Sequence, residues 1–62
     1  MYKIEAVVNG KRHSYEFRRE DFARSFADGM LTGVKRHSGD ITIFLLKETG
    51  SKGVYELLDI IE

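Results

Sequence analysis

The dipeptide Asn9-Gly10 is the feature that most narrows how this chain can fold. It lies between two runs of alternating apolar and polar residues, and Asn-Gly favours a two-residue type I′ turn because both turn positions need a positive φ. Such a turn fixes the register of the strands that it joins. On one face of the hairpin we therefore expect the pairs Val8–Lys11, Ala6–His13, Ile4–Tyr15 and Tyr2–Phe17. The other face would carry Lys3–Glu16, Glu5–Ser14 and Val7–Arg12, including one pair of opposite charges.

The spacing of apolar residues changes after this hairpin. Phe22, Phe26 and Met30 recur every four residues, which predicts a helix over Arg19–Gly29. Two acidic residues follow its start, where the helix dipole favours negative charge, and the glycine is suited to end it. We expect the Phe22/Phe26 stripe to pack on the apolar face of the hairpin.

The next segment reads as a turn, a strand and a loop. Ser38–Asp40 predicts a turn, and the β-branched and aromatic residues of Ile41–Lys47 predict a buried strand. Thr49–Gly53 is typical of a loop that closes a hairpin.

The C-terminal segment Val54–Glu62 fits two structures. Its apolar residues match a helical stripe, but Lys52 would lie at the positive end of that helix, and Asp59 and Glu62 at the negative end. We therefore favour a returning strand. The whole chain, 1–62, is then a single α+β domain of ββαββ order, with a four-stranded antiparallel sheet and one helix on one face; the alternative is ββαβα.

Size and composition limit the class of protein. A chain of 62 residues without cysteine cannot use disulfides to support a thin core, so we expect self-association, for example as a homodimer. Charged residues near the N-terminus and the lack of a long apolar run predict a cytoplasmic protein with no membrane partner. The formal net charge is zero, but residues 1–37 carry +3 and residues 38–62 carry −3, which suits an oriented partner.

Few residues are suited to catalysis or metal binding. The chain has no thiol and no glycine-rich phosphate loop. Two histidines, His13 and His37, lack the spacing of a metal site, and we expect His13 to be partly buried and hydrogen bonded. We therefore predict no enzyme activity, no cofactor and no metal.

Apolar residues in the second half of the chain exceed what one helix can cover. Large apolar side chains occur on both faces of the strand from Ile41, and again near the C-terminus. We expect an exposed patch that binds a protein partner or a second copy, formed by Phe44, Leu46, Tyr55 and Leu57. A regulator or inhibitor that acts by occupying a surface fits this pattern, as do small phage or mobile-element products.

The tetrapeptide Lys-Arg-His-Ser occurs twice, at Lys11–Ser14 and Lys35–Ser38. Both copies lie at or beside expected loops, where basic groups are commonly solvated. If they converged with the basic start of the helix, they could neutralise several phosphates of a nucleic acid. The residues of this alternative interface are Lys11, Arg12, Arg18, Arg19, Lys35 and Arg36.

Overall fold

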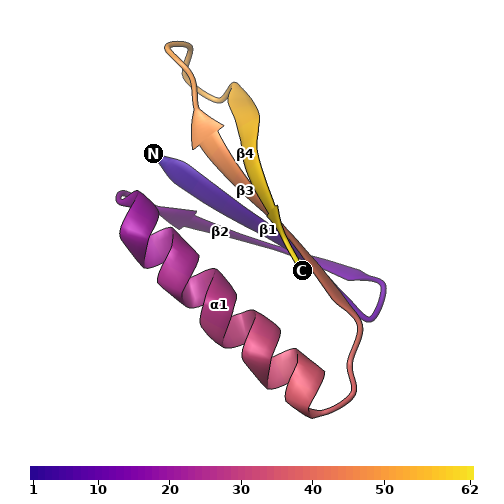
Figure 1. The fold of residues 1–62 in the computed structure, drawn as a ribbon. Coiled ribbons are helices and arrows are strands. Elements are labelled where there is room, and N and C mark those ends of the chain that lie inside the picture. The colour runs from indigo at the N-terminus through magenta and orange to yellow at the C-terminus, as the bar shows by residue number, and fades with distance from the viewer.

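The computed structural model describes all 62 residues and has the predicted ββαββ order. Its elements are β1 (Tyr2–Val8), β2 (Lys11–Phe17), α1 (Glu20–Arg36), β3 (Ile41–Glu48) and β4 (Tyr55–Ile61). All neighbouring strands are antiparallel, in the order β2-β1-β3-β4. The single helix lies against one face of the sheet (Figure 1). This α+β fold confirms the strand prediction for the C-terminal segment.

The β1–β2 hairpin has the predicted register at every position, from Tyr2 opposite Phe17 to Val8 opposite Lys11. Asn9 and Gly10 have φ values of 50° and 83°, as the primed turn requires. The expected ion pair does not form across this register. Lys3 instead lies beside Glu5, at 3.9 Å between Nζ and Oε1.

Helix α1 continues to Arg36, so the expectation that Gly29 ends it is wrong. The residues that follow Gly29 supply three apolar side chains, Met30, Leu31 and Val34, that pack against the core. Their burial outweighs the small propensity cost of glycine inside a helix. The turn that leaves the helix is made by Ser38, whose φ is 58°.

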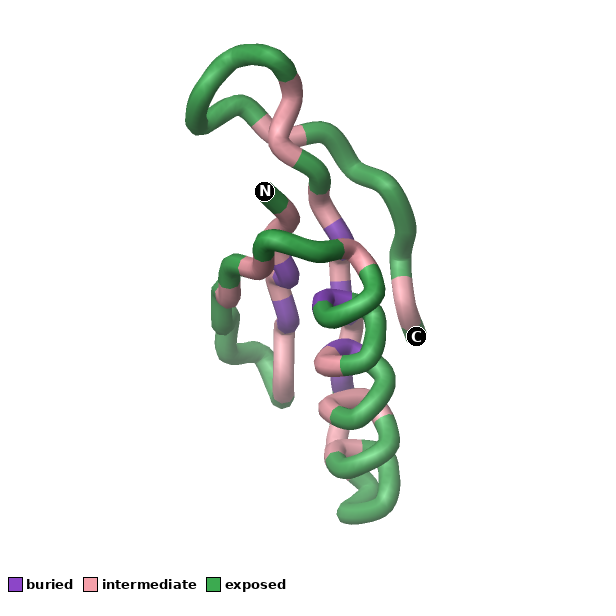
Figure 2. The backbone as a smooth tube through the Cα atoms, turned by 90° about the vertical axis from the view of Figure 1, so that its left-hand side faces the viewer, coloured by how far each residue is buried: buried purple, intermediate pink, exposed green.

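The core lies between the helix and the two middle strands. Figure 2 shows the buried residues on these elements. Seven residues are buried: Ile4 and Ala6 of β1, Ala23 and Ala27 of α1, and Ile41, Ile43 and Leu45 of β3. The two alanines allow the helix backbone to lie close to the sheet. A core of this size is thin even for a small domain.

The predicted aromatic stripe of the helix is only half correct. The Phe26 ring packs on Tyr15 and Phe17, with centroids 4.7 and 5.2 Å away. Phe22 does not reach the hairpin and is 57% exposed. Its ring instead lies 4.6 Å from the guanidinium of Arg19.

Strand β4 carries an irregularity that accounts for the apolar spacing of its sequence, which fits both a helix and a strand. Leu45 is opposite Asp59 and Leu46 is opposite Leu57, which leaves Leu58 without a partner on β3. This extra residue is a β-bulge, and it shifts the alternation of the strand by one position. The resulting apolar spacing resembles that of a helix, although the segment is extended.

No helix in the structure combines the length and the apolar character needed to cross a membrane.

Candidate protein-binding surface

The two faces of the sheet are covered unequally. Helix α1 covers the face that carries Ile4, Ile43 and Leu45, and no element covers the opposite face (Figure 1). We call this uncovered side the open face. Because side chains alternate along a strand, the register assigns its residues. Its apolar members are Val7, Phe44, Leu46, Tyr55, Leu57 and Ile60.

All four residues of the predicted interface lie on the open face. Phe44 and Leu46 come from β3, and their neighbours on β4 are Ile60 and Leu57. Tyr55 follows on β4 opposite Glu48. Leu57 is 52% exposed and the other three are half-buried. The strand register therefore places the four side chains next to one another.

Ile60 belongs to the same surface and was not predicted from the sequence. It is opposite Phe44 and is 47% exposed. Simple alternation from Leu57 would place it on the helix side. The bulge at Leu58 reverses that assignment, and the adjacent apolar pairs Leu57-Leu58 and Ile60-Ile61 are the sequence signal that accompanies it.

Charged groups border the apolar part of the open face. The ammonium group of Lys3 lies 4.9 Å from the centroid of the Tyr55 ring. Partial burial raises the pKa of Tyr55, and the carboxylates of Glu48 and Glu16 raise it further. The phenol therefore stays protonated at neutral pH and can donate a hydrogen bond to a partner.

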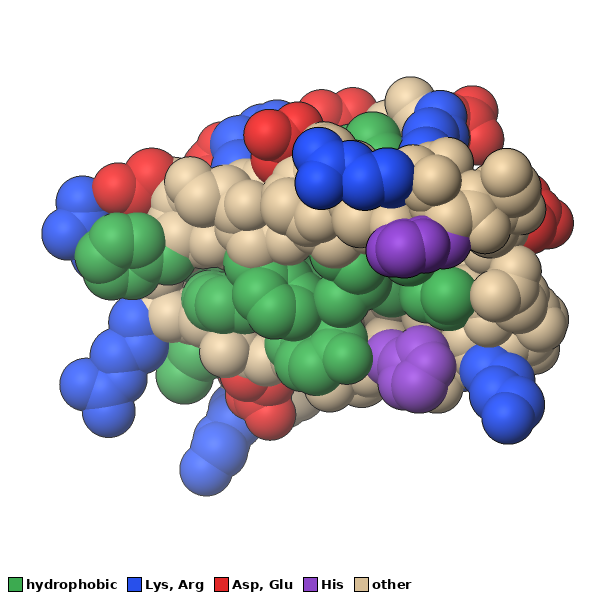
Figure 3. Space-filling model, turned by 90° about the horizontal axis from the view of Figure 1, so that it is seen from below, with side chains coloured by type: hydrophobic (Ala, Val, Ile, Leu, Met, Phe, Trp, Pro, Cys, Tyr) green, Lys and Arg blue, Asp and Glu red, His purple; other side chains and the backbone are tan.

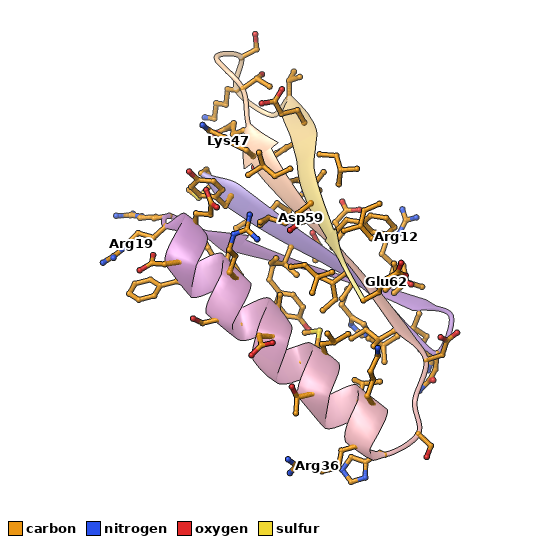
Figure 4. All side chains as sticks on the ribbon, viewed as in Figure 1. Arg12, Arg19, Arg36, Lys47, Asp59 and Glu62 are labelled. Carbon is orange, nitrogen blue, oxygen red and sulfur yellow. The ribbon has the colours of Figure 1, made fainter.

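An ion pair joins β4 to the helix on the covered side. Asp59 points from β4 toward α1 (Figure 4), and its Oδ2 accepts a hydrogen bond of 3.1 Å from Arg24. Oδ1 of the same carboxylate accepts the backbone N–H of Ile60 at 2.8 Å. Arg24 also donates to Glu20 at 2.8 Å; this bond, and then that to Asp59, raises the pKa of Arg24. These contacts fix the β4 backbone beside the bulge.

The two Lys-Arg-His-Ser copies lie at the same end of the molecule. The hairpin tip and the loop after α1 are joined there by two hydrogen bonds, from Asn9 N to Asp40 O at 2.8 Å and from Asp40 N to Asn9 Oδ1 at 2.9 Å. These bonds bring Lys11 and Arg12 to the same end of the molecule as Lys35 and Arg36, although the two pairs are far apart in the sequence.

The six predicted nucleic-acid contacts do not form one surface. Arg19, beside Arg18, lies at the opposite end of the helix from Arg36, and Arg12 is on the far side of the sheet from the helix (Figure 4). Arg19 is also engaged, since its guanidinium donates two hydrogen bonds to Asp21, at 3.0 and 2.7 Å.

The two histidines are both exposed, so the expectation that His13 is partly buried is wrong. His13 is on the helix side of β2, but near the hairpin tip, where the helix does not cover it. No group of three His, Asp or Glu side chains is arranged to hold a metal ion.

Comparisons with protein-family models, curated proteins and solved structures find no match to this chain.

Proposed function

We propose that this protein is a small non-catalytic binding module whose contact surface is the open face. One observation carries the proposal: Phe44, Leu46, Tyr55, Leu57 and Ile60 are neighbours on a sheet face that no helix covers. Contiguous apolar patches on small proteins commonly mark interaction sites. Its action would be that of a regulator or inhibitor that occupies a surface on its partner.

We propose a second copy of this chain as the first partner. The domain buries only seven of 62 residues and has no disulfide, so covering the open face would add apolar burial that the monomer lacks. Two copies related by a two-fold axis would bring the apolar centres of their open faces into contact. Such an interface needs no partner of different chemistry. The border offers charges of both signs, Lys3 and Glu5 among them, for contacts across such an interface. We propose the cytoplasm as its location, from the sequence argument above.

Sedimentation analysis of Leu57→Glu tests this proposal. The wild type should associate with itself as concentration rises, and Leu57→Glu should remain monomeric because it buries a charge in the interface. Leu57 is 52% exposed, so the variant should still fold, which circular dichroism checks. Phe22→Glu is the matched control: Phe22 is 57% exposed but lies on the helix, so its charge should leave association unchanged.

Two results would count against the proposal. A wild type that stays monomeric over about a hundredfold range of concentration removes the second copy as partner. The binding module then stands only if a captured protein is lost with Leu57→Glu and kept with Phe22→Glu. Equal behaviour of both variants in every binding assay contradicts the open face as the contact surface.

Nucleic-acid binding is the second candidate, favoured by the four basic residues that the repeat brings to one end. Its test is fluorescence anisotropy of labelled random-sequence DNA and RNA at low and physiological salt. Binding that weakens steeply with salt, and is lost when Lys11, Arg12, Lys35 and Arg36 become alanine, would establish it. The engaged Arg19 and the zero net charge favour the protein-binding proposal.

A further inference from the structure

A cavity lies at the end of the molecule where the two Lys-Arg-His-Ser copies meet. Its volume is about 490 Å³, within the range of pockets that hold small molecules. Its lining comes from the hairpin, the end of α1 and the following loop: Val8, Asn9, Met30, Gly33, Val34, His37 and Gly39. Figure 3 shows this side of the molecule, with both histidines of the chain (purple) on opposite sides of a strip of hydrophobic side chains.

The cavity exists because the helix side chain that would fill it is missing. Phe26 and position 33 are two turns apart and lie on the same side of α1. At Phe26 this side contacts Tyr15 of β2, with ring centroids 4.7 Å apart. At position 33 the residue is glycine, and a Cβ built there would meet no atom within 4 Å. The gap between the helix and the hairpin therefore stays open.

The surroundings of the cavity are positively charged. The segments 9–14 and 33–41, which surround it, bring Lys11, Lys35 and Arg36 to this end against one acidic residue, Asp40, while Arg12 is on the far side of the sheet. Lys11 is the register partner of Val8, which lines the cavity. At the helix end, the carbonyl of Val34 accepts the N–H groups of His37 and Gly39, and that of Lys35 accepts the N–H of Ser38, so two of the last carbonyl groups are already paired.

We propose that this cavity binds a small amphipathic carboxylate of the fatty-acid type. The apolar side chains of Val8, Met30 and Val34 would hold the hydrocarbon part, and Lys11 and His37 at the border would contact the carboxylate. The site is separate from the open face, because its lining belongs to the covered side of the sheet and to the helix. The inference does not rest on the proposed function.

Decanoate is the probe, followed by the backbone amide shifts of the full chain in NMR titrations. The expected result is saturable binding with a Kd on the order of 1 mM, as suits a small ligand in an open cavity. The largest shifts should occur at Val8, Met30, Val34, His37 and Gly39. Decanol, which has the same chain without the charge, should bind about tenfold more weakly.

Three variants make the test specific. Gly33→Leu should fill the cavity and weaken decanoate binding about tenfold or more, whereas Gly29→Leu should leave it unchanged. Gly29 has the same free space but does not line the cavity, and its side chain would lean toward the start of the helix. Lys11→Gln should weaken decanoate and leave decanol unchanged.

Each alternative outcome overturns the inference. No saturation by decanoate, or equal effects of the two glycine variants, removes the cavity as the site. Shifts centred on Phe44 and Leu57 would show adsorption to the open face instead. Equal affinities for decanol and decanoate would contradict the role of the positive charge.

Discussion

At the scale of single residues, Tyr55 combines an apolar contact with a titratable group. Its pKa is raised above the ordinary value, first by burial and then by Glu48 and Glu16. The phenol of the unfolded chain loses its proton near pH 10, as in model peptides, while that of the folded chain keeps it to higher pH. The folded state then binds more protons, so the free energy of unfolding should fall as the pH rises from about 10.

This alkaline loss should be smaller in Tyr55→Phe. Urea unfolding followed by circular dichroism at about pH 8 and about pH 11 measures it, with Tyr2→Phe, which removes a phenol hydroxyl from a residue packed against the core, as the control. An equal drop in both variants and the wild type would show that Tyr55 does not contribute.

The fold requires glycine at position 39, because there is no room there for a side chain. A Cβ there would lie 2.5 Å from Cγ1 of Val34 and 3.0 Å from its carbonyl oxygen. We expect Gly39→Ala to lower the free energy of unfolding by about 1–3 kcal/mol, because the loop after the helix must move. Gly50→Ala, where a Cβ meets nothing within 4 Å, should change it little. Chemical denaturation compares the two, and equal effects would contradict the close contact.

At the scale of elements, the distance between α1 and the sheet depends on two alanines. Ala23 and Ala27 are fully buried one turn apart on the helix. Ala27→Leu should lower the free energy of unfolding by about 1–3 kcal/mol, since the larger side chain pushes the helix away from the sheet. Ser25→Leu adds the same side chain at an exposed position of α1 and should be nearly neutral. Urea midpoints of the two variants check this, and similar midpoints would disprove it.

At the scale of the whole molecule, the thin core makes stability sensitive to single changes and to assembly. A domain of this length has a free energy of unfolding of roughly 3–9 kcal/mol. Leu45→Ala should remove about 2–5 kcal/mol of it, leaving a chain near the limit of folding. Thermal unfolding followed by circular dichroism measures this loss.

If the open face pairs two copies, the Tm of the wild type should rise with protein concentration, because association stabilises the folded state. Leu57→Glu should have a Tm independent of concentration. A Tm of the wild type that does not change with concentration would argue against pairing.

The sequence determines some of these features through local geometry and leaves others to packing. Asn9-Gly10 needs positive φ at both positions, which fixes the hairpin register without reference to the rest of the fold. The end of α1 was mispredicted because a local glycine signal at Gly29 competes with the burial of Leu31 and Val34, which only the tertiary structure provides. The cavity was not predicted either. It depends on the gap between Gly33 and the hairpin, which only the tertiary structure provides.

The candidate surface also has residues that local sequence patterns predict and residues that depend on tertiary packing. Phe44 and Leu46 follow from alternation along β3, and the register places both on the open face. Ile60 could not be assigned, because the bulge at Leu58 arises from pairing with β3 and not from any local residue preference. The use of this surface for binding stays a prediction.

The irregular end of β4 also affects how further strands could add at this edge of the sheet. A regular apolar strand at the border of a sheet is a template on which further chains can add without limit. Here the unpaired Leu58 distorts that template, the Asp59 carboxylate occupies the N–H of Ile60, and the same carboxylate is held by Arg24. Addition of a further strand at the β4 edge is thereby discouraged, so this edge can display Leu57 and Ile60 to a partner on the open face without serving as a regular template.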